Sequence, residues 1–159
     1  MMCSDSVQEF IERYNISATL YRFSDTVESV EKASHMCGTD PSNIIKTLVL
    51  IADSLPVIAI VPGNKKLSYR KLANVVKARS LRMAKPHEVK MYTGFDVGGV
   101  SPLTECIKNY MIVVDQDVAG KEYVWCGGGD LYSLALVKVR DILAILNPVI
   151  ADISDPPNN

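Results

Sequence analysis

One lysine interrupts an otherwise apolar stretch in the first third of the chain. Lys46 lies within residues 44–51, IIKTLVLI, whose β-branched and aliphatic side chains predict a central strand. A lysine in such a strand either lines a pocket or extends its amine along its aliphatic stem to solvent. Burying an ammonium without an acceptor is costly, so a lysine that keeps its charge there needs an anion or carbonyl oxygens. The spacing alone leaves both alternatives open.

Two glycine-rich segments could bring backbone N–H groups close to a ligand. The first is residues 98–102, GGVSP, which predict an irregular loop because paired glycines permit positive φ and proline lacks a donor. Consecutive amides there could cradle a carbonyl oxygen or a phosphate. The second is residues 126–130, CGGGD, between two expected strands. Neither segment has the spacing of a dinucleotide-binding or P-loop motif, and an ordinary tight turn remains the alternative for each.

A hydrolase with a protein nucleophile is the competing interpretation. Ser101 or Cys126 could attack an ester, with His35 or His87 as the base. The sequence has no G-x-S-x-G motif, and Ser101 is followed by proline. His87 stands among charged residues, which favours an exposed side chain. These patterns disfavour a covalent mechanism.

The cysteines and histidines do not form a metal-binding pattern. Cys3, Cys37, Cys106 and Cys126 are scattered without a C-x-x-C pair, and the chain has 2 histidines. A structural zinc site requires four closely spaced thiolate or imidazole ligands. We therefore expect no metal and no other cofactor, and four reduced thiols as in a cytoplasmic protein.

The formal net charge of −1 hides a separation of charge along the chain. Residues 54–87 contain eight basic residues and no Asp or Glu, so this basic segment carries +8 and the remainder −9. Cations concentrated in one region gain affinity for a polyanion by releasing its condensed counterions. The segment therefore favours a phosphate-bearing partner, with a solvated helix face as the alternative. The expected contacts to RNA are Lys65, Lys66, Arg70, Lys71, Lys77 and Arg79.

Base stacking is not expected in the basic segment. Tyr69 is the only aromatic residue among its cations. A surface that binds single strands without sequence preference combines cations with several aromatic rings. Backbone contact to a folded RNA therefore fits this segment better.

Length and composition predict one folded domain. A chain of 159 residues with 48% hydrophobic and 22% charged residues can bury a single core. No apolar run approaches the roughly 18–20 residues that cross a bilayer. The first residues also lack the basic region and apolar stretch of a signal peptide. We expect a cytoplasmic protein with one domain over residues 1–153 and a disordered tail at 154–159.

Apolar periodicity predicts both helices and strands. The expected helices cover residues 7–14, 26–37, 68–78, 86–93 and 138–146, and the expected strands cover residues 17–23, 44–51, 57–61, 81–83, 110–114, 123–126 and 132–136. The strands at 44–51 and 57–61 are expected to be antiparallel neighbours. Because helices and strands do not alternate strictly, we expect an α+β fold with a mixed, mostly antiparallel sheet.

The order of these motifs resembles one known family. Lys46-Thr47-Leu48 on a strand, the loop GGVSPL at 98–103 and Gly127-Gly128 between strands precede a helix that contains DILAIL. Together they resemble the YbaK family of aminoacyl-tRNA deacylases, which also supplies the editing domain inserted in bacterial prolyl-tRNA synthetases. The resemblance extends from about residue 16 to residue 153. It implies a compact α+β domain with a partly closed sheet flanked by helices, no metal and no covalent intermediate.

The resemblance also implies a function. The implied activity is that of a freestanding trans-editing enzyme, an aminoacyl-tRNA hydrolase that cleaves the ester of mischarged tRNA, commonly tRNA for proline carrying Cys or Ala. Its implied partners are mischarged tRNA and, as a second candidate, prolyl-tRNA synthetase, with no membrane. Lys46 matches the family's essential lysine, and Gly98 and Gly99 complete the implied catalytic set. The implied substrate-binding residues are Phe23, Val100, Ser101, Pro102, Cys126 and Gly127.

This sequence departs from the family at two of these positions. Cys126 lies where close relatives have Ser or Thr, and Phe23 lies where some have Tyr. Both positions face the pocket by analogy, so they bear on which amino acid is accepted. Two other functions stay open: a non-catalytic module that binds tRNA or a synthetase, and a hydrolase of small esters or thioesters that does not bind RNA.

Overall fold

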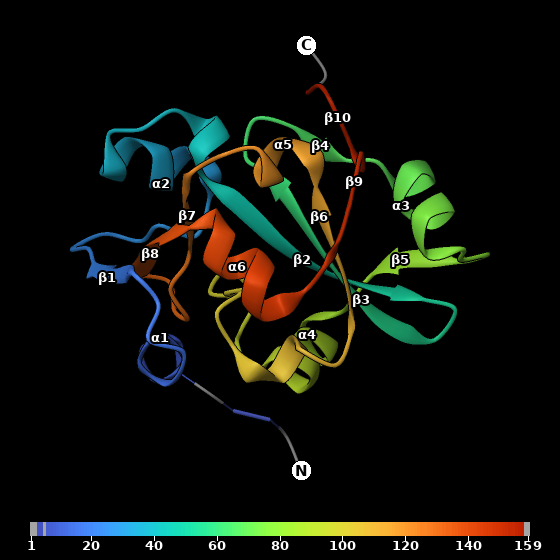
Figure 1. Cartoon of the computed structure of the whole chain (residues 1–159), viewed down its shortest axis with the longest axis horizontal. Helices are drawn as coiled ribbons and strands as arrows, with labels where there is room; N and C mark the ends of the chain where they lie inside the picture. Colours follow the sequence, from blue (N-terminus) through green and yellow to red (C-terminus); the bar gives the residue numbers. More distant parts are fainter. Residues whose placement is uncertain (1–2, 5, 158–159) are drawn as a thin grey trace.

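The computed structural model describes residues 3–4 and 6–157 of the chain. Helices and strands are mixed along it, as expected (Figure 1). In chain order the elements are α1 (Val7–Arg13), β1 (Ala18–Arg22), α2 (Val30–Cys37), η1 (Pro41–Asn43), β2 (Ile45–Ala52), β3 (Leu55–Pro62), β4 (Lys66–Leu67), α3 (Tyr69–Val76), β5 (Leu81–Met83), α4 (Pro86–Thr93), η2 (Glu105–Ile107), β6 (Met111–Asp115), α5 (Gln116–Ala119), β7 (Tyr123–Gly127), β8 (Ser133–Lys138), α6 (Val139–Leu146), β9 (Val149–Ala151) and β10 (Ser154–Asp155).

A mixed five-stranded sheet in the order β5-β2-β3-β6-β9 forms the centre of the fold. β2 and β3 are antiparallel along their whole length, as predicted, and are joined by a turn at Asp53 and Ser54, which have φ of 47° and 78°. β5 also pairs antiparallel with β2, whereas β3, β6 and β9 run parallel to one another. The expected α+β fold with a mixed sheet is therefore confirmed.

A second, antiparallel sheet in the order β1-β8-β7 packs against one face of the first. Alternate residues of a strand point to opposite faces, so Ile58 and Ile60 of β3 meet Val124 of β7 and Val137 of β8 in one buried cluster. Buried side chains of the helices α1, α4 and α6 belong to the same cluster. The partly closed sheet implied by the resemblance is not found, because the strands of the described residues form separate open sheets.

The opposite face of the five-stranded sheet is covered by α3. Leu72 of α3 is fully buried against Leu50, Ala59 and Val61 of the neighbouring strands, and Ile153 completes this second cluster. The hydroxyl of Ser68 accepts a hydrogen bond from the Lys71 amide and caps the helix, as its position in the sequence indicates. The apolar side of α3 is therefore its buried side.

The helix predicted at residues 26–37 begins later than expected. The hydroxyl of Ser29 accepts a hydrogen bond from the Lys32 amide, so the helix starts at Val30. The Val27 amide instead donates to the Leu131 carbonyl at 2.7 Å. This bond keeps the segment before α2 extended against the turn between β7 and β8. Gly38, with φ of 61°, ends the helix as predicted.

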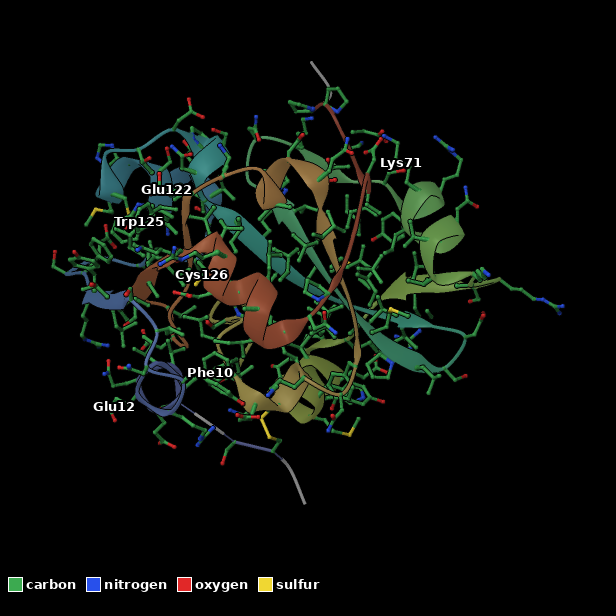
Figure 2. The ribbon with its side chains drawn as sticks, in the orientation of Figure 1. Phe10, Glu12, Lys71, Glu122, Trp125 and Cys126 are labelled. Atoms are coloured by element: carbon green, nitrogen blue, oxygen red, sulfur yellow. A yellow bond between two sulfur atoms is a disulfide. The ribbon has the colours of Figure 1, made fainter. Side chains whose placement is uncertain are left out.

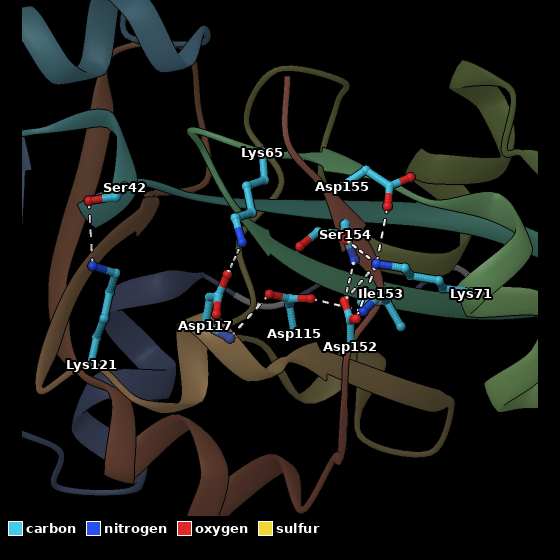
Figure 3. A network of polar contacts seen from close by, with 10 residues as sticks. All are labelled: Ser42, Lys65, Lys71, Asp115, Asp117, Lys121, Asp152, Ile153, Ser154 and Asp155. Atoms are coloured by element: carbon cyan, nitrogen blue, oxygen red, sulfur yellow. Dashed lines mark hydrogen bonds and ion pairs between the residues drawn. The ribbon is translucent and has the colours of Figure 1, made fainter. Parts of the chain in front are cut away.

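A buried carboxylate connects the C-terminal strands to the rest of the sheet (Figure 3). Asp115, at the end of β6, accepts hydrogen bonds from the amides of Ile153 and Asp117 at 2.9 Å and 3.1 Å. Asp117 forms an ion pair with Lys65, next to β4. Lys71 of α3 forms ion pairs at 3.1 Å with Asp152 and at 3.1 Å with Asp155. Two cations of the basic segment are therefore paired with acids from distant parts of the chain.

Two predictions about the ends of the chain are wrong. Cys3 and Cys106 form a disulfide that closes a sequence separation of 103 residues, whereas Cys37 and Cys126 are free thiols. Ser154 and Asp155, expected to be disordered, form β10, which pairs with Leu67 and Lys66 of β4. The last two residues of the predicted tail, 158 and 159, lie outside the described residues.

No helix in the described part of the chain has the length and apolar character needed to cross a membrane.

One exposed ion pair joins β5 to α4. The guanidinium of Arg82 donates to both carboxylate oxygens of Glu88 at 2.7 Å and 3.0 Å. Glu88 also accepts the Lys85 amide at 2.8 Å, which caps the first turn of α4. The Arg82 hydrogen bonds, with this amide bond, lower the pKa of the Glu88 carboxyl from 4.5 to about 2.

The lowered pKa of Glu88 predicts an acid-sensitive part of the stability. Because the folded-state pKa lies below the unfolded value, this stabilisation is complete above pH 4.5 and is lost as pH falls toward about 2. We expect Glu88→Gln to lose more free energy of unfolding at pH 7 than at pH 2.5, measured by urea denaturation. Glu122→Gln, at an exposed glutamate, is the control and should show no such difference. An equal loss at both pH values for Glu88→Gln would contradict this account.

Candidate active site

A cleft of about 370 Å³ opens along one edge of β2. β5 pairs with β2 only at Leu50, Ile51 and Ala52, so residues 45–49 have no neighbouring strand of this sheet on that side. The loop at residues 97–100, the segment before α2 and the ends of β7 and β8 complete the walls. The cleft therefore lies where the two sheets and two loops meet.

Lys46 lies in this cleft and is half-buried. Its Nζ donates a hydrogen bond of 2.6 Å to the backbone carbonyl of Lys65. Burial lowers the pKa of the Lys46 amine from its ordinary value, because desolvation disfavours the charged form. The carbonyl supplies the acceptor that a lysine on an apolar strand requires. An ammonium has three N–H donors, so two remain available to a ligand.

Thr47 is a cleft residue that the sequence analysis did not single out. Its Oγ1 is buried and has no hydrogen-bond partner among the described residues. The Ala84 amide donates to the Val49 carbonyl at 3.0 Å, so the backbone groups of alternate residues, including Thr47, point to this open edge. A buried hydroxyl without a partner was the only available signal, and it requires coordinates to be recognised.

The glycine loop at residues 98–102 lies only partly in the cleft. Gly98, with φ of 94°, and Val100 line the cleft. The Gly99 amide donates to the Asp96 carbonyl at 3.0 Å and is therefore already used. The amides of Gly98 and Val100 have no acceptor in the part of the chain that the structure describes. Of the three consecutive amides at residues 98–100, two therefore remain as possible donors.

The two glycine-rich segments pack against each other backbone to backbone. A Cβ added to Gly127 would lie 2.0 Å from the Val100 carbonyl oxygen, and one added to Gly99 would lie 2.9 Å from the Asp130 Cα. No side chain fits at either position without moving the backbone. Gly127 also lines the cleft. Glycine at these positions therefore fixes the loop in the wall of the cleft that Lys46 also lines.

The other substrate-binding residues inferred from the resemblance lie behind the cleft wall. Ser101, Pro102 and Cys126 are buried, and Phe23 packs against the cluster formed by Val27, Ala33, Ile44 and Leu134. None of these four predicted residues is among those that line the cleft. In the present geometry they support the cleft wall and do not form its surface.

The possible nucleophiles are in positions unsuited to covalent catalysis. The Ser101 Oγ accepts a hydrogen bond from the Leu103 amide at 3.1 Å and is fully buried. Complete burial raises the pKa of the Cys126 thiol to about 12, so it is protonated at neutral pH. Both histidines, His35 and His87, are exposed. In this geometry, neither Ser101 nor Cys126 can act as a nucleophile activated by a neighbouring general base.

The predicted RNA contacts divide into paired and unpaired cations. Lys65 and Lys71 are bound to acids as described above. The four others are exposed and have no ion pair among the described residues: Lys66, Arg70, Lys77 and Arg79. They lie on and around α3, on the side of the molecule where Figure 2 labels Lys71.

In the described part of the chain, no three His, Cys, Asp or Glu side chains are grouped to hold a metal ion.

Comparison with known proteins identifies the family. The family model for the aminoacyl-tRNA editing domain matches residues 24–145, which include the cleft and both glycine segments. The chain belongs to this family.

The sequence relatives are much longer proteins. A proline–tRNA ligase of Geobacter metallireducens is 35% identical over 127 residues, which cover 79% of this chain and 21% of the ligase. One of Nitratidesulfovibrio vulgaris strain DP4 is 37% identical over 75 residues, covering 47% of this chain and 13% of the ligase. The chain therefore corresponds to a small part of these enzymes.

A solved structure matches almost the whole chain. It is described as a proposed trans-editing enzyme for prolyl-tRNA synthetase, with 26% sequence identity and a TM-score of 0.85. The match covers 94% of this chain and 94% of that one. The chain therefore shares its fold with that protein over almost its whole length.

The close contact at Gly127 predicts a large effect of one methyl group. We expect Gly127→Ala to lower the free energy of unfolding by about 1–3 kcal/mol, because its Cβ would displace the Val100 carbonyl. Gly120→Ala is the matched control, since its Cβ would meet only the Gln116 carbonyl at an ordinary 3.7 Å. Urea denaturation of both variants measures the difference. Equal stability of the two variants would contradict the packing described here.

Proposed function

We propose that this chain is a freestanding aminoacyl-tRNA deacylase that removes the amino acid from mischarged tRNA, with Cys- or Ala-charged tRNA for proline as its substrate. The observation that carries this proposal is that half-buried Lys46 lines one cleft together with Gly98 and Val100, whose amides have no acceptor among the described residues. Family membership and the similarity to an editing-type structure support it.

The proposed chemistry requires no protein nucleophile. The ester that joins an amino acid to tRNA has a good leaving group, so orientation of water and stabilisation of negative charge can suffice. The amides of Gly98 and Val100 would donate to the ester carbonyl oxygen as charge develops on it. Lys46 would bind the terminal adenosine or the aminoacyl group through its remaining N–H donors, and the 2′-hydroxyl of the ribose or the substrate thiol would assist the attacking water.

The unpaired cations around α3 would hold the body of the tRNA. Lys66, Arg70, Lys77 and Arg79 are exposed, and a polyanion gains affinity by releasing counterions when such groups approach its phosphates. Lys65 and Lys71 are less suited to this role, because their amines are bound to Asp117 and Asp152. Prolyl-tRNA synthetase is proposed as a second partner, solely because the relatives of this chain are described as proline–tRNA ligases.

Lys46→Ala tests the proposed site. We expect its rate of release of Ala and Cys from tRNA for proline to fall by about 100-fold or more, the usual effect of losing a group that binds charge in an active site. The assay is a panel of mischarged tRNAs incubated with purified protein. Lys108→Ala is the control, because that amine is held by Tyr14 and does not line the cleft.

Three results that differ from this expectation would each reject a different part of the proposal. Unchanged turnover by Lys46→Ala would remove Lys46 from the mechanism. Binding of tRNA without release by the wild-type protein would identify a non-catalytic module. Release from free esters alone would identify a small-molecule hydrolase.

Charge reversal on α3 tests the tRNA surface. We expect Arg70→Glu combined with Lys77→Glu to raise KM for aminoacyl-tRNA and to reduce the slope of log K against log salt by about 2, one unit for each lost phosphate contact. The charge-reversing control is Arg140→Glu, at an exposed cation of α6. Kinetics between 50 and 200 mM salt, about the range in which such contacts change affinity strongly, measure the slope. Identical slopes for both variants would place tRNA elsewhere.

A further inference from the structure

An aromatic face lies on the outer side of the three-stranded sheet, away from α3. Tyr21 of β1 and Trp125 of β7 contact each other, with ring centroids 5.2 Å apart and planes tilted by 51°. Tyr123, two residues before Trp125, lies on the same face because strand residues alternate. Tyr21 and Tyr123 are each 43% exposed, so both rings are accessible to a ligand. Figure 2 shows Trp125 on the opposite side of the view from Lys71.

A cation accompanies these rings. The Lys138 Nζ lies 5.8 Å from the centroid of the Tyr123 ring, and the two residues are directly opposite each other in neighbouring strands. Lys138 has no ion pair among the described residues. The face therefore offers π-surfaces together with an unneutralised positive charge.

The aromatic face lies close to the cleft. Tyr21 is opposite Leu134 of β8, which is opposite Gly127 of β7. Leu134 and Gly127 both line the cleft that holds Lys46. Trp125 packs against the buried cluster that contains Leu134, so a ligand chain that leaves the cleft would pass around this cluster to reach Tyr21 and Trp125.

We propose that the aromatic face, formed by Tyr21, Tyr123, Trp125 and Lys138, stacks the unpaired nucleotides at the 3′ end of tRNA while the aminoacyl group occupies the cleft. This proposal rests on the proposed function. A base-paired RNA keeps its base faces covered, whereas an unpaired end can stack its bases on aromatic side chains. Lys138 would approach a phosphate of the same segment. The face near the cleft would then bind the single-stranded end, and the cations around α3 would bind phosphates of the folded body.

Trp125 is the only tryptophan of the chain, so it reports binding at this face directly. We expect its fluorescence to be quenched saturably by uncharged tRNA, and not by the same tRNA lacking its unpaired 3′ nucleotides. Tyr21→Ala should weaken the quenching titration by about 10-fold, the usual effect of removing one stacking ring. Tyr21→Phe keeps the ring and should keep the affinity. Tyr92→Ala is the control, since Tyr92 of α4 packs against Tyr110 and belongs to neither proposed tRNA surface.

The outcomes separate this proposal from the proposed function. Equal quenching by intact and trimmed tRNA, or tRNA binding detected by gel shift without quenching, would overturn the aromatic face as the site for the 3′ end. Equal affinity of Tyr21→Ala and wild type would also overturn it. Quenching that requires the 3′ end, in a protein that releases no amino acid from the mischarged panel, would support the face and reject the deacylase activity.

Discussion

The unequal length of two neighbouring strands is the constraint on which the site depends. β2 has eight residues, but its outer neighbour β5 pairs with only three of them. The first half of β2 therefore keeps one edge without a partner strand, and backbone groups on that edge face a cleft. A longer β5 would satisfy those groups and fill the space that holds Lys46. The cleft thus follows from incomplete strand pairing in the central sheet.

The walls of the cleft depend on close backbone contact. Gly99 and Gly127 allow the two glycine-rich segments to approach more closely than any side chain would permit. Gly98 and Val100 then line the same cleft as the first half of β2, while Ser101, Pro102 and Cys126 are buried and do not line it. Neighbours in sequence therefore have different roles: some line the cleft, and others support its wall.

Much of the fold was predictable because its signals are local. The β2–β3 hairpin follows from two apolar runs around a short turn, and α3 follows from Ser68 and its apolar spacing. Lys46 could be singled out because a charge within an apolar strand is conspicuous. Thr47 could not, because threonine is common in strands and only its missing partner distinguishes it. The pairing of Lys71 with Asp152, across a separation of 81 residues, and the Cys3–Cys106 disulfide depend on tertiary contacts that no local pattern indicates.

The hydrogen bond between Lys46 and the Lys65 carbonyl has a consequence for ligand affinity. A free lysine side chain has about 2 kcal/mol of rotamer entropy, part of which is lost whenever a ligand immobilises it. In this protein the Lys46 amine already donates a hydrogen bond to the backbone oxygen of Lys65, 2.6 Å away. The side chain of Lys65 is itself paired with Asp117. Much of the rotamer entropy of the Lys46 side chain has therefore already been lost during folding. An incoming anion or carbonyl meets a preorganised cation and loses less binding free energy to immobilising it.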